Sequence, residues 1–374
     1  MTSGYGDPQA FAASTSPASV PFECRRDFVQ GVLSPRTQDW TGRSILVVGD
    51  DRPAAEAVAA QLSEAEMTCE PNAPSSGAGH YLVLFRGRSL PPGAGTEELF
   101  RAALAATADD GVMLASLPSK HGLYPLALVG GIVRRFMPQR GCMAPAELAR
   151  RVVDTLPRGH HFRLRDQYME ELVEGGDDAF AALGDVSPEG HYEVSEVHAL
   201  IERCGAAFGG WLWPAVYNPC RCIEDPVASE VVAKLEEPRK STVADLITAG
   251  PTVHHFAVFK NGAALTEPDW ASEGALSWRP MRLSAYNWAP IGLAGASQWT
   301  LEPYPRSEFT GRVDLKPWHG RLCMAADGGK SVAELLELAE VRRAFDVPKS
   351  EWQSAALAFL RDALELRVVA MLPP

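Results

Sequence analysis

Two side chains able to exchange protons, His121 and Tyr124, follow a short apolar run at residues 112–115. A run of this kind is typical of a buried strand of a parallel sheet, and open α/β sheets bind their ligands beyond the carboxyl ends of the strands. An imidazole or a phenol at that position could orient a substrate or accept its proton. The sequence therefore predicts a catalytic role for His121 and Tyr124, against the alternative of a surface histidine and a tyrosine that packs its helix.

A second group of potentially reactive side chains lies further along the chain, at Cys220, Cys222, His254 and His255. The two histidines fall in a predicted strand at residues 252–259, where successive side chains point to opposite faces, so at most one of them can face a given pocket. A single residue separates the two cysteines, whereas structural zinc sites space paired cysteines by two to four. We predict no metal site, and a role in the core or at a sheet edge for the histidines.

Strands and helices alternate through the first two thirds of the chain. Apolar runs bounded by turn residues predict strands, and Ala-rich or amphipathic stretches, some with proline in the first turn, predict helices. The predicted strands are residues 44–49, 67–70, 81–85, 111–116, 208–216 and 252–259, and the predicted helices are residues 22–33, 53–66, 96–106, 123–136, 145–156, 196–204 (capped by Ser195) and 227–249. This alternation is typical of an α/β fold with a parallel sheet.

The chain divides into four predicted parts. Residues 1–20, rich in Ser, Ala and Pro, predict a disordered tail, and residues 21–260 hold the α/β domain. Residues 261–308 have no clean hydrophobic period and predict an irregular linker. Residues 309–374 predict a small winged-helix-like domain, with a strand at 320–324, helices at 331–339 and 349–365, and a strand at 367–372; Ser331 and Glu334 have the spacing of a capping box.

Composition and charge limit the classes of partner. The net charge of -12 argues against a general nucleic-acid binder, because neutralising phosphates needs a surplus of Lys and Arg. No stretch reaches the ~18 to 20 uninterrupted apolar residues that span a bilayer, and residues 1–20 lack the basic start of a secretory signal. We therefore expect a cytoplasmic protein without nucleic-acid or membrane partners. Because the charges after Arg312 nearly cancel, we expect the C-terminal unit to bind a peptide or protein or to form a homo-oligomer contact.

The sequence resembles the class I S-adenosylmethionine-dependent methyltransferases over residues 22–260. In that family a glycine-rich, acidic loop after the first strand lies against the cofactor, and an acid ending the second strand binds the ribose hydroxyls. On that pattern the run ILVVGDDRP at residues 45–53 supplies Gly49 and Asp50, and Glu70 stands at the place of the ribose acid. The resemblance implies a Rossmann-like methyltransferase sheet that binds S-adenosylmethionine through Gly49, Asp50 and Glu70; the alternative for the Gly-Asp-Asp run is an ordinary turn.

Further segments resemble a bacterial subgroup of these methyltransferases more specifically. They are SKHGLY at residues 119–124, YEVSE at residues 192–196, PAVY at residues 214–217 and HF at residues 255–256. The first of them contains both proton-exchanging candidates. If the chain is an active methyltransferase, the resemblance implies catalysis mainly by positioning the nucleophile in line with the methyl sulfonium, with His121 or Tyr124 as base.

The chain also departs from the family pattern in two places. Val47, Asp51 and Pro53 stand where the family has an acid and two further glycines. Only about ten residues separate Glu70 from His80, too few for a crossover helix and a further strand, so one strand with its helix is predicted to be missing. The sequence therefore predicts a methyltransferase-like protein with a small-molecule or protein acceptor, or else a catalytically inactive pseudo-methyltransferase that serves as a protein-binding partner or scaffold.

Overall fold

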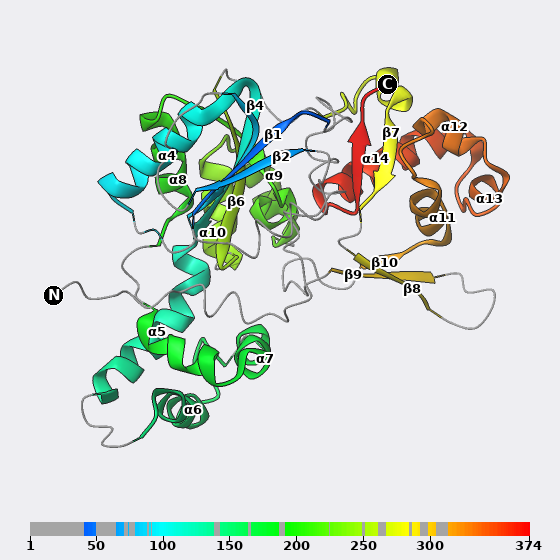
Figure 1. Cartoon of the computed structure of the whole chain (residues 1–374). Coiled ribbons are helices and arrows are strands. Elements are labelled where there is room, and N and C mark those ends of the chain that lie inside the picture. Colours follow the sequence, from blue (N-terminus) through cyan, green and yellow to red (C-terminus); the bar gives the residue numbers. More distant parts are fainter. Residues whose placement is uncertain are drawn as a thin grey trace.

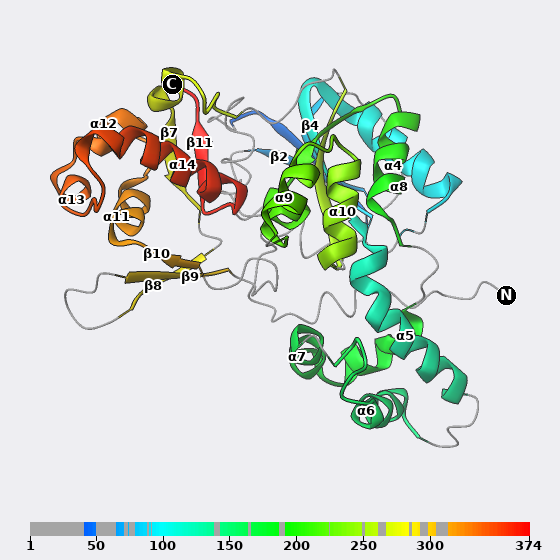
Figure 2. The same cartoon turned by 180° about the vertical axis from the view of Figure 1, so that it is seen from behind.

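The computed structural model describes residues 41–49, 65–70, 74, 79–87, 90, 92–137, 143–163, 166–186, 191–223, 225–248, 251–260, 267–283, 286–291, 298–303 and 313–374. These residues form a central sheet with helices, a helical subdomain connected to it through α5, and a C-terminal unit beside it (Figures 1 and 2). No helix within these ranges is both long and apolar enough to cross a membrane.

The central sheet follows the order β2-β1-β3-β4-β6-β5. Its strands are β1 (Ser44–Val48), β2 (Glu66–Glu70), β3 (His80–Arg86), β4 (Thr107–Pro118), β5 (Ala207–Trp211) and β6 (Val253–Phe259). The first four pair in parallel, whereas β6 lies antiparallel between β4 and β5. The expected α/β class with a mostly parallel, Rossmann-like sheet is confirmed. Because β2 and β3 lie on opposite sides of β1, the strand order reverses between β1 and β3.

Nine residues, 71–79, separate the end of β2 from the start of β3. The two strands lie on opposite sides of β1, and β2 forms an edge of the sheet within the part of the chain that the structure describes. The missing strand and helix expected from the short Glu70 to His80 spacing stay a prediction.

The central strand β1 shows why these runs are continuously apolar. Leu46 and Val48 pack into the core on one face of the sheet, and Ile45 and Val47 pack into the core on the other. All four are at most 1% exposed, because the strand is covered on both sides.

One face of the sheet is covered by α4 (Ala94–Ala106) and α8 (Val194–Arg203). Glu193, rather than the expected Ser195, is the N-cap residue of α8. The Glu196 carboxylate accepts from the Glu193 N–H at 2.8 Å, as in a capping box.

Proline ends two of the expected elements early. The strand expected at residues 208–216 stops at Trp211, and Pro214 begins the 3-10 helix η4 (Pro214–Tyr217). The helical stretch expected at residues 227–249 is divided into α9 (Pro226–Ala233) and α10 (Arg239–Thr248). Pro238 directly precedes α10, where it cannot continue a preceding helix.

A helical subdomain extends away from the sheet (Figure 1). It consists of α5 (Lys120–Phe136), which starts where β4 ends, followed by α6 (Pro145–Thr155) and α7 (Asp166–Ala182). Val133, Val153 and Phe162 belong to a core of its own, separate from the two cores of the sheet. Through α5 this subdomain is attached to the carboxyl edge of the sheet.

The C-terminal unit shares a core with the second face of the sheet. Its elements are η6 (Glu273–Ser277), β7 (Arg279–Arg282), α11 (Pro317–Ala325), α12 (Val332–Leu336), α13 (Ala339–Arg342), η7 (Lys349–Glu351), α14 (Trp352–Glu365) and β11 (Val369–Leu372). Leu84 of the sheet lies in one cluster with Leu322 and Leu360. The buried Arg367 side chain donates from Nε to the Leu212 carbonyl at 2.9 Å. The two parts are thus joined by apolar packing and by a buried hydrogen bond.

Residues 320–324, expected to be a strand, lie inside helix α11. Pro317 starts this helix, since proline suits the first helical turn, and the helix buries Leu322 and Cys323. Ser331 caps α12 as expected, with its hydroxyl accepting from the Glu334 N–H at 3.3 Å. The order of α12, α14 and β11 agrees with the expected helix, helix and strand, and a winged-helix-like domain stays a prediction.

The segment expected to be an irregular linker, residues 261–308, contains regular elements where it is described. In addition to η6 and β7 it holds β8 (Tyr286–Ile291) and β9 (Gln298–Pro303), which pair with each other, and β9 also pairs with β10 (Val313–Leu315). The strand β7 pairs with β11 at the far end of the chain, with Pro280 opposite Met371. The strand β7 has only four residues, and its proline and two arginines hide a strand pattern in the sequence.

Candidate functional site

The carboxyl ends of β1, β2 and β3 meet at the point where the strand order reverses. Gly49 follows β1 with a φ of 118°, and its N–H donates to the Glu70 carbonyl at the end of β2, at 3.1 Å. A Cβ at Gly49 would lie 2.6 Å from the Arg86 carbonyl at the end of β3. Both the backbone angle and the close approach therefore require glycine. Reversal points of this kind are where open α/β sheets bind ligands.

Two of the three predicted cofactor-binding residues are thus brought together at this reversal point, where a ligand-binding crevice is expected. Gly49 and Glu70 are joined through their backbones, and Glu70 is half-buried. Asp50 lies outside the described residues.

A row of hydrogen-bonded polar side chains, which sequence reasoning missed, lies next to Gly49. Arg86, 2% exposed, donates from Nη1 to the Ser116 hydroxyl at 3.3 Å, and the Ser116 hydroxyl lies 2.8 Å from Nδ1 of His255. With the Ser116 proton donated to Nδ1, the His255 ring carries its own proton on Nε2. The available signal was a charged residue directly after the apolar run of β3.

The Arg86 and Ser116 side chains lie on the sheet face that the C-terminal unit covers. Arg86 is two residues beyond Leu84 and Ser116 two beyond Leu114, and both leucines belong to the core shared with that unit. Arg86 therefore places a buried guanidinium on this face of the sheet, next to Gly49.

The predicted catalytic residues His121 and Tyr124 lie in the first turns of α5, directly beyond β4. Ser119 caps this helix by accepting from the Gly122 N–H at 3.2 Å. His121 and Tyr124 are three residues apart, so they are neighbours on the helix surface. Tyr124 is 49% exposed, and the His121 side chain is half-buried.

Behind His121 lies a carboxylate that the sequence did not single out. Oδ2 of Asp245, on α10, is 3.8 Å from Nε2 of His121. Asp245 is 2% exposed, and its Oδ1 has no hydrogen-bond partner among the described residues. Burial, assisted by the nearby Glu193 carboxylate, raises the pKa of Asp245 to about 7. A half-buried imidazole backed by a carboxyl that titrates near neutrality is suited to moving protons.

His254, by contrast, belongs to the core, in agreement with the sequence-based expectation. Its Nε2 donates to the Tyr192 carbonyl at 2.9 Å, and its Nδ1 accepts from the Tyr217 hydroxyl at 2.7 Å. The ring is fully buried, and burial lowers its pKa to about 4. His254 is therefore a neutral, fully hydrogen-bonded imidazole that fastens β6 to η4 and to the start of α8.

The cysteines are not gathered into a metal-binding cluster in the part of the chain that the structure describes. The Cys220 thiol faces the Ser229 carbonyl at 3.6 Å, Cys222 is exposed, and no three His, Cys, Asp or Glu side chains of the described residues lie close enough to hold an ion.

Comparison with known proteins identifies the fold. No protein-family model and no curated protein matches the sequence. The structure of PKMT2 from Rickettsia typhi matches 94% of this chain and 76% of its own with a TM-score of 0.59, and the structure of that protein in complex with AdoHcy matches with a TM-score of 0.61, both at 10% identity. The plantazolicin methyltransferase BpumL in complex with SAH matches 68% of this chain and 96% of its own, at 12% identity and a TM-score of 0.31. The chain has a class I methyltransferase-like fold.

Proposed function

We propose that this protein is an S-adenosylmethionine-dependent methyltransferase whose cofactor lies beyond the carboxyl ends of β1 and β3. The observation that carries the proposal is the convergence of Gly49 and Glu70 at the reversal point of the sheet. The similarity in fold to PKMT2 from Rickettsia typhi, solved in complex with AdoHcy, supports binding of this cofactor.

The residues at the crevice have the chemistry that the cofactor needs. The Glu70 carboxylate would accept hydrogen bonds from the ribose hydroxyls, and the glycine turn at Gly49 lets the backbone approach the ligand closely, with Asp50 continuing that loop. When bound, S-adenosylmethionine would supply an electrophilic methyl group, released from its sulfonium sulfur to the acceptor, and would leave as S-adenosylhomocysteine.

His121 would accept the proton of the acceptor, and Asp245 would hold and polarise the imidazole from behind. Val48 at the end of β1 is level with Ala115, and β4 continues for three more residues to Pro118. With two strand spacings to the side, the start of α5 lies about 14 Å from the end of β1, so only a ligand that extends over that distance would reach both. Tyr124, one turn along the helix, would orient the acceptor. The acceptor is a small molecule or a protein whose nucleophile carries a proton near neutral pH.

A catalytically inactive scaffold is the second candidate. The short β2 to β3 connection favours it, because the missing strand would leave less surface to enclose the adenine. In that case the fold persists for protein binding and the crevice binds no cofactor.

Calorimetric titration with S-adenosylhomocysteine separates the two. We expect affinity in the micromolar range, about -8 kcal/mol. The variant Glu70→Ala should weaken binding about tenfold or more, since it removes the ribose acceptor. The matched control is Glu66→Ala, which removes an exposed carboxylate from the other end of the same strand and should leave binding unchanged. Neither heat nor a thermal shift at ligand concentrations of about 1 mM would refute the methyltransferase and leave the scaffold.

A further inference from the structure

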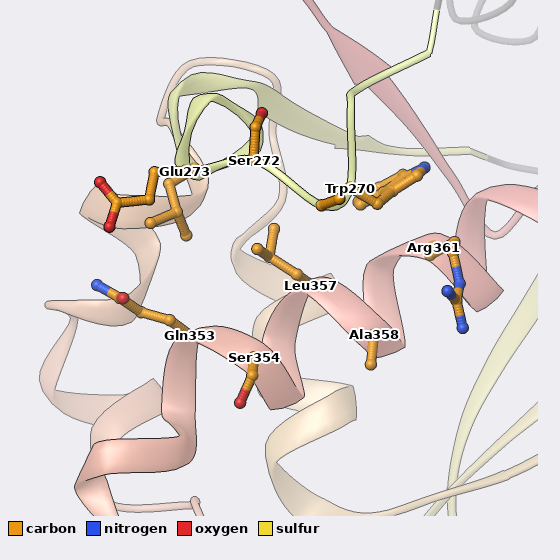
Figure 3. Close-up of a pocket in the computed structure, with 10 residues that line it drawn as sticks. Trp270, Ser272, Glu273, Gln353, Ser354, Leu357, Ala358 and Arg361 are labelled. Carbon is orange, nitrogen blue, oxygen red and sulfur yellow. The ribbon is translucent and has the colours of Figure 1, made fainter.

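A hollow on the C-terminal unit lies apart from the crevice. It has a volume of about 360 Å³ and is formed between the segment that leads into η6 and one side of α14 (Figure 3). Trp270, Leu276 and Leu357 are half-buried at its surface. These three side chains pack against the core shared with the sheet, so the hollow has a firm apolar floor.

The hollow is an open groove rather than an enclosed cavity. Many of its lining residues are exposed, and from α14 these are Gln353, Ser354, Ala358 and Arg361. Small-molecule sites bury most of the ligand surface, which an open groove does not do. From Gln353 to Arg361 the helix rises about 12 Å, which is the length of three to four residues of extended chain.

The two ends of the groove carry opposite charges. Figure 3 shows Glu273 near Gln353 at one end, and Arg361 near Trp270 at the other. Glu273 and Arg361 are exposed, and neither forms an ion pair or a side-chain hydrogen bond within the described part of the chain. Both charges are therefore available to a partner. Tryptophan and arginine are also the residue types that contribute most often to binding at protein interfaces.

We propose that this groove binds a short extended peptide segment with a basic side chain at one end, an apolar side chain in the middle and an acidic side chain at the other. The basic group pairs with Glu273 and the acidic group with Arg361, while the apolar side chain lies on Leu276 and Leu357. Because an extended chain advances about 3.4 Å per residue, the two charges of the peptide are four residues apart.

Saturation-transfer NMR with three pentapeptides, capped at both ends, tests the charge pattern. The probes are Lys-Ala-Leu-Ala-Asp and its like-charged relatives Lys-Ala-Leu-Ala-Lys and Asp-Ala-Leu-Ala-Asp, titrated against the full chain. We expect the mixed-charge peptide to bind about fivefold more tightly than either relative, because each relative loses one ion pair and places like charges together. Equal binding of the three peptides, or binding of none, overturns the proposal.

A variant that reverses the order of peptide affinities shows that the groove is still folded, because a misfolded groove would bind none of the peptides. In Arg361→Glu both ends of the groove are acidic, so Lys-Ala-Leu-Ala-Lys should become the tightest of the three peptides. The matched control is Arg343→Glu, because Arg343 is an exposed arginine of the same unit outside the groove, and it should leave the order unchanged. An unchanged order in Arg361→Glu contradicts the proposal.

Two further measurements separate this proposal from a self-association of the protein and from the methyltransferase proposal. A dimer of the full chain that Trp270→Ala dissociates, without peptide binding, would assign the groove to a second copy and overturn the peptide proposal. Binding of S-adenosylhomocysteine should be the same in all groove variants, so failure here is distinguishable from failure of the methyltransferase proposal.

Discussion

Two histidines at the carboxyl edge of the sheet, His254 and His121, have opposite environments and different roles. His254 is fully buried, with both ring nitrogens hydrogen-bonded, and its low pKa keeps it neutral. His121 is half-buried and faces Asp245, whose second oxygen has no hydrogen-bond partner among the described residues. A satisfied buried imidazole fixes the positions of three segments. An imidazole beside an unsatisfied buried carboxyl is held at a cost in stability, which is typical of sites that perform chemistry.

The largest expected effect is on activity, at His121. In His121→Gln the rate of transfer from methyl-labelled S-adenosylmethionine, with an acceptor found by screening peptides and small nucleophiles, should fall by about 10² to 10⁴ because the general base is lost. Stability should change by less than about 0.5 kcal/mol. His161→Gln, at an exposed histidine of the helical subdomain, is the matched control and should retain full activity. A His121→Gln rate within about threefold of the wild type would remove His121 from the mechanism.

The second effect is on stability, at His254. His254→Leu leaves the Tyr217 hydroxyl and the Tyr192 carbonyl without their buried partner, so the free energy of unfolding should fall by about 2 to 4 kcal/mol. Urea denaturation measures this change. Tyr217→Phe removes only one of the two hydrogen bonds and should cost less. Equal stability of wild type and His254→Leu would show that this imidazole does not fasten the segments.

The third effect is a gain in stability at Asp245, with an opposite change in activity. Its pKa is raised from 3.8 to about 7, so the folded protein binds more protons than the unfolded chain between these values, and stability falls as the pH rises through that window. Asp245→Asn removes the buried charge. It should therefore raise the free energy of unfolding at pH 8 by about 1 to 3 kcal/mol and leave it nearly unchanged at pH 4.

The same variant should lower the transfer rate, because the imidazole of His121 loses its carboxyl partner. Asp362→Asn, at an exposed aspartate of α14, should change neither property. A loss of stability in Asp245→Asn at pH 8 would show that the carboxylate is well accommodated in the fold and would contradict the contrast with His254.

The smallest effect is expected at Tyr124, which is exposed and only orients the acceptor. Tyr124→Phe should raise KM by about threefold and leave kcat nearly unchanged, since the hydroxyl contributes one hydrogen bond in contact with water. Steady-state kinetics with the same acceptor measure both constants. A fall in kcat of about a hundredfold or more would make Tyr124 the base in place of His121.

The sequence predicted several strands of the sheet well, since β1 and β3 hold continuous apolar runs that require cover on both faces. It also placed Gly49, Glu70 and His121 at the carboxyl edge, because the end of such a run is visible in the chain itself. The C-terminal unit was predicted less well. Its strand β7 contains a proline and pairs with β11, so neither propensity nor period identified it.

The sequence by itself determined which residues of β1 and β3 must be buried and where these two strands end, because apolar runs and turn residues act locally. Only the tertiary structure decided which residues pack against each candidate catalytic residue. Helix α10 buries Ser241 and Asp245, four residues apart, and exposes Leu246 and Ile247, the reverse of what a hydrophobic pattern predicts. The indole of Trp211 donates to Ser241, which faces inward with Asp245, and such partners come from distant segments. The buried face of α10 is therefore set by its packing against distant segments, and this packing places Asp245 next to His121.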